Sequence, residues 1–136
     1  RSEEVIRGPI VPLLKMLQKY PEYEQEVKVP EKVWPLRIWY MYEQNVCTLI
    51  DVNERERKVK IRNYTDKVMF RAFGTVEDPN YNDYQEFLES RCFPESRDKM
   101  KLILKDLGLP FYDPIMIIEK TEGRMAEDDF WIRIER

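Results

Sequence analysis

The stretch LRIWYMYEQNVCTLIDVNERERKVKIR, residues 36–62, decides the fold because its hydrophobic residues recur at alternate positions. A period of two places successive side chains on opposite faces of a β-strand, and β-branched and aromatic residues favour strands. The polar runs EQN and NERE interrupt the pattern and are typical of turns. The stretch therefore predicts an antiparallel β-meander, with strands at residues 36–42, 46–52 and 58–62.

The first and third of these strands differ in how their two faces are composed. The first strand has hydrophobic residues at both sets of alternate positions, so we expect it to be covered on both faces. In the third strand, Val59 and Ile61 are expected to face the core. The opposite face of the third strand then carries three cations, Lys58, Lys60 and Arg62.

Helical patterns follow the meander. Asn80 or Asn82 is a candidate N-cap for a helix with a hydrophobic side formed by Tyr84, Phe87 and Leu88. Pro94 suits the first turn of a second helix, which would end at Gly108. Asp113 and Pro114 resemble the cap and first position of a short helix at residues 115–120. Residues 130–135 predict a closing strand, and the whole predicts an α+β fold: a small antiparallel β-meander with several helices packed on one side.

The length and composition of the chain bound its class. A chain of 136 residues with 43% hydrophobic and 36% charged residues fits one globular domain, residues 1–136. Helical spacing of Ile10, Leu13, Leu14 and Leu17 makes residues 1–33 a candidate N-terminal helical arm, and Pro21 is expected to end or bend its helix. No hydrophobic run is long enough to span a membrane, so we expect a cytoplasmic protein with no membrane partner. Because the chain begins with arginine, we expect that its native start was removed or lies upstream.

The absence of histidine from the sequence excludes several classes of site. It removes the Ser-His-Asp triad, the Cys-His pair and zinc sites that use imidazole ligands. Cys47 and Cys92 are too few for a thiolate zinc site; we interpret them as small buried hydrophobic residues in a reducing compartment, with a disulfide as the alternative. The four glycines are too dispersed for a phosphate-binding loop. Carboxylate chemistry or a Mg²⁺ or Ca²⁺ site remains chemically possible, so an enzyme with a carboxylate-bound metal is an alternative. Our expectation is a protein that is not an enzyme and that uses no cofactor or metal.

Acidic and aromatic residues near the C-terminus have structural and functional interpretations. Residues 127–129 are consecutive carboxylates, which cannot all converge on one metal ion, so a turn or cap before the last strand is favoured. Trp131 and Trp34 fit either the core or an exposed anchor for a protein partner.

Two groups of cations offer an alternative function, binding of nucleic acid. Lys58, Lys60 and Arg62 would contact phosphates from the third strand, with Tyr64 or Trp39 available for stacking. Arg97, Lys101 and Lys105 recur every four residues and would form a stripe on the second helix. The competing interpretation is an ordinary solvated surface, and the net charge of −3 gives no general attraction to nucleic acid.

Two later motifs carry a resemblance to a known family. The run FLESRCFPESR, residues 87–97, resembles an Arg-x-hydrophobic-Pro-x-x-Arg segment in the N-terminal region of HipA-like serine/threonine kinases of Gram-positive bacteria. The run GRMAEDDFWI, residues 123–132, is similar to the Gly-Leu-Ser-Leu-Ser-Asp-x-Tyr-Trp-Ile motif of that family, although RMAE replaces its Leu-Ser-Leu-Ser. The resemblance covers roughly residues 46–132 and includes a small β-structure before the motifs.

The resemblance implies a role without catalysis. It does not extend to the nucleotide loop, the catalytic aspartate and the metal-binding aspartate of the kinase domain, so we expect a separate N-terminal module that binds or restrains a kinase-domain protein. A toxin–antitoxin or mobile-element system is the expected setting. Its partner-binding residues would come from the two motifs: Arg91, Phe93, Arg97, Phe130 and Trp131.

Overall fold

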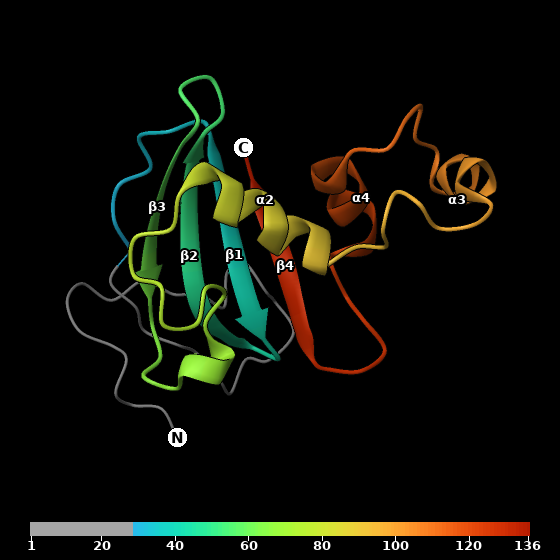
Figure 1. Cartoon of the computed structure of the whole chain (residues 1–136). Coiled ribbons are helices and arrows are strands. Elements are labelled where there is room, and N and C mark those ends of the chain that lie inside the picture. Colours follow the sequence, from blue (N-terminus) through green and yellow to red (C-terminus); the bar gives the residue numbers. More distant parts are fainter. Residues whose placement is uncertain (1–28) are drawn as a thin grey trace.

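The computed structural model describes residues 29–136 of the chain (Figure 1). The helix expected before Pro21 lies outside the described residues, as does most of the candidate N-terminal arm, residues 1–33.

A four-stranded antiparallel sheet forms the centre of the molecule (Figure 1). The expected meander is confirmed, as is the closing strand. The closing strand pairs with the first strand of the meander, so the order across the sheet is β3-β2-β1-β4. The strands are β1 (Leu36–Tyr42), β2 (Asn45–Asn53), β3 (Lys58–Asn63) and β4 (Phe130–Glu135).

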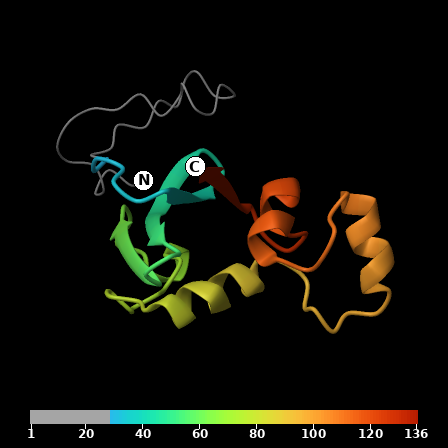
Figure 2. The ribbon, with the colours of Figure 1, turned by 90° about the horizontal axis from the view of Figure 1, so that it is seen from above.

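Two helices pack against the sheet, and both begin at the residues that the sequence indicates. Asn80 caps α2 (Tyr81–Ser90): its side chain accepts a hydrogen bond from Asp83 N, and the Asp83 carboxylate accepts one from Asn80 N. Asp113 caps α4 (Pro114–Thr121), with Pro114 at its first position. Figures 1 and 2 show α2 crossing one face of the sheet and α4 lying beside β4.

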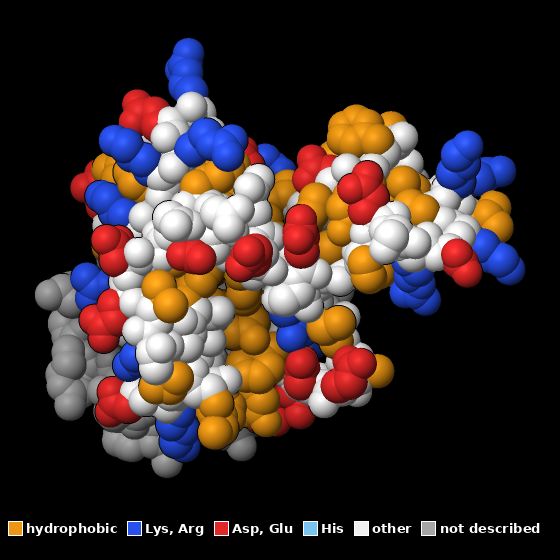
Figure 3. Space-filling model, in the orientation of Figure 1, with side chains coloured by type: hydrophobic (Ala, Val, Ile, Leu, Met, Phe, Trp, Pro, Cys, Tyr) orange, Lys and Arg blue, Asp and Glu red, His pale blue; other side chains and the backbone are white. Residues whose placement is uncertain are grey.

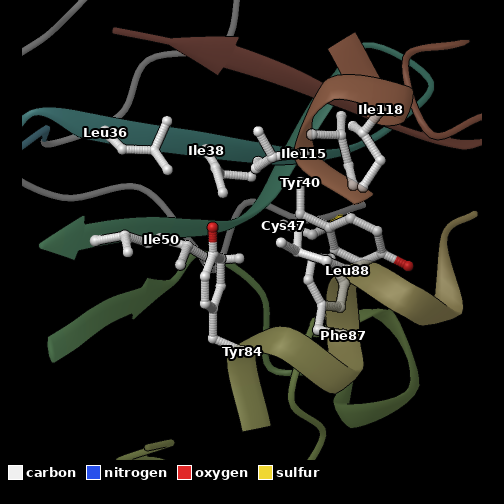
Figure 4. Packing of buried hydrophobic residues seen from close by; sticks show 12 residues of the cluster. Leu36, Ile38, Tyr40, Cys47, Ile50, Tyr84, Phe87, Leu88, Ile115 and Ile118 are labelled. Carbon is white, nitrogen blue, oxygen red and sulfur yellow. The ribbon is translucent and has the colours of Figure 1, made fainter. Parts of the chain in front are cut away.

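The main core lies between the sheet and these two helices. Tyr84, Phe87 and Leu88 of α2 are buried there with Ile115 and Ile118 of α4. They pack on strand residues that share one face of the sheet, Leu36, Ile38, Tyr40, Cys47, Ile50, Val52 and Ile132. Figure 4 shows these side chains converging from the helices and the strands. The α+β fold class is therefore confirmed.

The opposite face of the sheet carries a second hydrophobic cluster. Its members are buried, and Val29 packs against them. The cluster consists of Trp39, Met41, Val46, Leu49, Tyr64 and Trp131. The prediction that the first strand is covered on both faces is confirmed, because β1 contributes buried residues to both clusters.

One helix does not follow the prediction. Residues 94–97 form a turn, in which Arg97 N donates to Pro94 O at 3.0 Å, so Pro94 does not open a helix. The helix α3 (Met100–Leu107) begins later, after Lys99, whose φ of 61° is left-handed and interrupts any helical path from Pro94. It does end at Gly108, as predicted. In Figures 1 and 2, α3 stands away from the sheet, so the helices packed on the sheet are α2 and α4.

The two edges of the sheet are protected to different degrees. Along β4, Ile132 N donates to Glu122 O at 2.7 Å, and Arg136 forms an ion pair with Glu119 of α4 at 2.9 Å. The helix and its C-terminal turn therefore lie along the outer edge of β4. Among the described residues, no strand pairs with the outer edge of β3.

Candidate interaction surface

Arg91 joins the two sequence motifs inside the molecule. It is the C-cap of α2 and only 7% exposed. Its Nη1 and Nη2 donate to the two carboxylate oxygens of Asp128 at 3.0 and 3.1 Å. Its Nε and Nη2 donate to Gly123 O at 3.0 and 2.7 Å, and Nη2 also donates to Phe130 O at 3.1 Å. A planar guanidinium presents its donors in a fixed fork, which suits this set of acceptors.

Asp128 organises the turn that leads into β4. Its carboxylate accepts a hydrogen bond from Phe130 N at 3.0 Å, in addition to those from Arg91. The hydrogen bonds from Arg91 lower the pKa of the Asp128 carboxyl from its ordinary value, and partial burial opposes them. The interpretation of residues 127–129 as a turn or cap is therefore confirmed, and Arg91 is the counter-ion that the sequence did not identify.

Two of the five residues expected to bind a partner, Arg91 and Trp131, make hydrogen bonds within the chain. The Arg91 guanidinium is occupied as described above. Trp131 is 8% exposed, its Nε1 donates to Glu43 O at 2.7 Å, and the Arg124 guanidinium lies 4.9 Å from the centre of its ring. Both side chains are buried and help to hold β4 in place. Their expected role in binding a partner stays a prediction.

Phe130 is half-buried in an aromatic cluster on the α2 face of the sheet. Its ring stacks on Tyr40 with centroids 4.8 Å apart and an interplanar angle of 3°. Tyr42 and Phe70 complete the cluster, with centroids 4.9 and 5.6 Å from Phe130. Phe70 ends the short 3-10 helix η2 (Val68–Phe70), in which Met69 is 83% exposed. The outer side of this cluster is one place where hydrophobic side chains come to the surface (Figure 3).

The remaining two motif residues lie at the base of a projecting arm, defined as residues 92–112. Phe93 is half-buried, with its carbonyl accepting a hydrogen bond from Tyr112 Oη at 2.8 Å. The rings of Phe93 and Tyr112 meet edge to face with centroids 6.4 Å apart. Arg97 is exposed, and its guanidinium lies 5.7 Å from the centre of the Phe93 ring. These contacts tie the outgoing and returning segments of the arm together.

The outer part of the projecting arm exposes both hydrophobic and basic side chains. Leu102 of α3 and Phe111 after it are each 57% exposed. Lys101 and Lys105 are exposed and lie four residues apart, on one side of α3. Arg97 does not continue their stripe, because it precedes the helix. Figure 3 shows the arm, at the right, with hydrophobic side chains next to lysine and arginine.

The basic residues of β3 lie far from those of the arm. Lys58, Lys60 and Arg62 are all exposed, as the alternation predicted. The Lys60 ammonium lies 4.7 Å from the centre of the Trp34 ring. Figure 1 places β3 and α3 at opposite ends of the molecule, so the two groups of cations do not form one continuous basic surface.

A buried ion pair next to these cations was not predicted. Arg37 of β1 donates from Nε and Nη2 to the carboxylate of Asp51 on β2 at 2.7 and 3.0 Å. Both residues are at most 9% exposed. The only signal in the sequence is that one charged residue interrupts each of two hydrophobic strands, and the strand register that pairs them comes from the fold.

Clusters of metal-ligating side chains and disulfides are both absent from the described part of the chain. Residues 29–136 contain no cluster of three cysteine or acidic side chains that would hold a metal ion. Cys47 and Cys92 are both free thiols, so the disulfide alternative is wrong for this pair. Burial raises the pKa of Cys47 to about 12, and that of Cys92 is raised for the same reason. Between residues 29 and 136, no helix combines the length and hydrophobicity of a membrane span.

Comparisons with known proteins give no relative for this chain: no protein-family model, no curated protein and no solved structure matches it.

Proposed function

We propose that this protein is a binding module without catalysis, which uses the projecting arm to dock on a protein partner. The observation that carries the proposal is the position of α3. This helix has eight residues, and helices shorter than about 12 residues are marginally stable in water without tertiary packing. Nevertheless, α3 stands apart from the sheet with Leu102 and Phe111 exposed (Figure 2).

The base of the arm supports a docking role because it is held firmly on both sides. On one side, Arg91 anchors the end of α2 to Gly123 and Asp128. On the other side, Asp113 caps α4, which is buried against the sheet. A rigid base lowers the entropy lost when the arm binds a partner. Hydrophobic anchors near an exposed arginine also fit the composition of protein interfaces, in which aromatic residues and arginine are enriched.

The partner class we propose is a kinase-domain protein, and this part of the proposal rests on the resemblance to HipA-like N-terminal regions. Three residues of the two motifs lie in contact in this chain, which supports the proposal. Arg91, Gly123 and Asp128 build the joint between α2 and β4, so their spacing would be retained wherever that joint is needed. Arg97, Leu102 and Phe111 are exposed and would contact the partner, with the half-buried Phe93 at the base of the arm beside them.

The test uses a kinase-domain protein encoded by a gene next to the gene of this chain. Titration calorimetry measures the binding of the purified chain to that protein. Leu102→Asp and Phe111→Asp are each expected to weaken the complex by about tenfold or more, because each buries a charge in the interface. Val76→Asp is the matched control, since Val76 is 46% exposed and lies outside the arm. Equal affinity of all three variants, or no complex with such a kinase, contradicts the proposal.

Binding of nucleic acid is the second candidate function. The observation that favours it is the group of exposed cations on β3, with the Trp34 ring next to Lys60. Lys58, Lys60 and Arg62 would contact phosphates from one strand face. Such binding would weaken steeply with salt, because each phosphate contact releases counter-ions. Absence of binding to single-stranded and duplex DNA at low salt would remove this candidate.

A further inference from the structure

A cavity of about 200 Å³ lies beside β3, on the face of the sheet opposite α2. Leu49 of β2 lines this cavity and is only 1% exposed, so the cavity has a hydrophobic base. In the strand register, Leu49 lies opposite Arg62 and Asp51 opposite Lys60, which places two cations of β3 at the cavity. Pockets for drug-sized molecules measure roughly 300–1,000 Å³. This cavity therefore has room for one small ring system rather than a whole cofactor.

The segment before β1 supplies one wall of the cavity. Val33 lines the cavity and is 66% exposed, and the half-buried Trp34 lines it next to Val33. The Lys60 ammonium lies 4.7 Å from the centre of the Trp34 ring. Trp39 and Tyr64, the rings that the sequence suggested for stacking, are 2% and 3% exposed in the second hydrophobic cluster. Trp34 is therefore the aromatic ring that the described residues place at the cavity.

The charged groups at the cavity favour an anion. Asp51 lines the cavity, but its two carboxylate oxygens accept hydrogen bonds from Arg37 at 2.7 and 3.0 Å, which balances its charge. None of the ion pairs within residues 29–136 includes Lys60 or Arg62. Glu31 is an exposed carboxylate among the lining residues and opposes these cations. Hydrophobic walls, an aromatic ring and two cations together suit a flat ring system that carries a negative charge.

We propose that this cavity takes an unstacked base of a single-stranded nucleic acid, with the adjoining phosphates on Lys60 and Arg62. The inference rests on the second candidate function, binding of nucleic acid, and names the form that is bound. A nucleotide joins a flat ring system to a phosphate. Proteins that bind single strands combine aromatic side chains, on which bases stack, with cations that contact the backbone.

The cavity distinguishes single strands from duplexes. Cations on the surface of a strand contact the phosphates of either form. A base in a duplex is stacked and paired, so it has to be flipped out of the helix before it can enter a cavity. The base of a single strand is already accessible. The cavity therefore predicts a preference for single strands that the cations by themselves do not.

The first experiment measures the fluorescence anisotropy of labelled nucleic acids that are titrated with the full chain at low salt. The single strands are oligothymidylate and oligouridylate of about ten nucleotides, within the site sizes of single-strand-binding folds. They are expected to bind about tenfold more tightly, or more, than a DNA duplex of the same length. Thymidine monophosphate, added as a competitor, is expected to bind about tenfold more weakly than oligothymidylate, because it brings only one phosphate.

A pair of variants tests whether a base contacts Trp34. Trp34→Ala is expected to weaken single-strand binding about tenfold or more and to leave its salt dependence unchanged, because the stacking of the base is lost. Phe111→Ala is the matched control, since the Phe111 ring is 57% exposed and lies on the projecting arm. Circular dichroism establishes that both variants are folded. Equal affinities of the two variants would contradict the position of the base.

A second set of variants locates the phosphates. For single strands, the logarithm of the affinity falls with the logarithm of the salt concentration by roughly 0.7 per phosphate contact. Lys60→Gln is expected to reduce this slope by about 0.7, whereas Lys101→Gln, on α3, leaves it unchanged. Glu31→Gln removes the opposing charge and is expected to strengthen binding about twofold. A slope that responds equally to Lys60→Gln and Lys101→Gln would contradict the position of the phosphates.

Three further outcomes would overturn the proposal. If single strands and the duplex bind equally and Trp34→Ala has no effect, the cations bind nucleic acid but the cavity takes no base, and the second candidate function survives. If no probe binds at low salt, the second candidate function and this inference both fail. If thymidine monophosphate binds as tightly as oligothymidylate, the ligand is a free nucleotide rather than a single strand.

Discussion

The guanidinium of Arg91 forms a bidentate ion pair with the carboxylate of Asp128, at 3.0 and 3.1 Å, across 37 residues of sequence. The pair connects the end of α2 to the turn before β4, and the same guanidinium also binds the carbonyl oxygens of Gly123 and Phe130. The segment between Arg91 and Asp128 contains the projecting arm and α4. The side chain of Arg91 therefore holds the two ends of this segment together.

Replacing Arg91 should destabilise the fold. Arg91→Met is expected to lower the free energy of unfolding by about 3 kcal/mol, because it leaves the Gly123 and Phe130 carbonyls and the Asp128 carboxylate without their donor. Chemical denaturation measures this change. Arg97→Met is the control, since Arg97 is exposed, and a change within about 0.5 kcal/mol is expected. Equal effects of the two variants would show that Arg91 is not the joint described here.

Acid should weaken the same joint. The folded-state pKa of Asp128 lies below its ordinary value of 3.8, chiefly because Arg91 hydrogen-bonds to the charged form. A depressed carboxyl pKa contributes stability that is complete above the unfolded value and is lost as pH falls through the folded value. The free energy of unfolding should therefore decrease as the pH is lowered from 3.8 through the folded-state pKa of Asp128. The variant Asp128→Asn should start less stable and lose less on acidification; an identical acid profile would exclude this origin.

Gly123 should tolerate a side chain less well than Gly108. Both have positive φ, at 61° and 75°, so alanine at either position adopts a strained left-handed conformation. A Cβ at Gly123 would also lie 3.0 Å from Ile132 Cδ1, whereas a Cβ at Gly108 meets nothing within 4 Å. We expect Gly108→Ala to cost about 1 kcal/mol and Gly123→Ala about 2 kcal/mol or more. Thermal unfolding of the two variants measures the difference, and a larger loss at Gly108 would contradict the packing at Gly123.

The buried hydroxyl of Tyr84 should lower the stability of the fold. Tyr84 is 1% exposed, and its Oη has no hydrogen-bond partner among residues 29–136. Burial without a partner is unfavourable, so Tyr84→Phe is expected to raise the free energy of unfolding by about 1 kcal/mol. Tyr112→Phe is the comparison, because Tyr112 Oη donates to Phe93 O, and its loss should destabilise the arm. A loss of stability in Tyr84→Phe would reveal a partner for the hydroxyl.

The two thiols should differ in reactivity. Cys47 is 3% exposed in the main core, and burial raises its pKa to about 12, so the unreactive thiol form dominates in the folded protein. Cys92 is half-buried at the base of the arm. Alkylation followed by mass spectrometry should label Cys92 first and Cys47 only after denaturant is added. Simultaneous labelling in the folded state would contradict the burial of Cys47.

The sequence by itself determined the secondary structure of most of the fold. Alternation along residues 36–62 specified three strands, and Asn80, Asp113 and Gly108 marked where helices begin or end. These signals are local, because each depends on the backbone preferences of a few neighbouring residues. The same local reasoning was wrong at Pro94, where a proline suited to a first turn is followed by left-handed Lys99 and no helix begins.

Only the tertiary structure decided what the charged and aromatic motif residues do. The sequence suggested a partner surface for Arg91 and a turn or cap for residues 127–129, and Trp131 fitted the core better than a partner anchor without excluding either. Whether such side chains face solvent depends on which distant segment packs against them, and here β4 docks beside β1 and brings Asp128 to Arg91. Long-range pairing is not encoded in any short window of sequence, so the local pattern predicted the elements while the packing assigned their side chains to the interior or the surface.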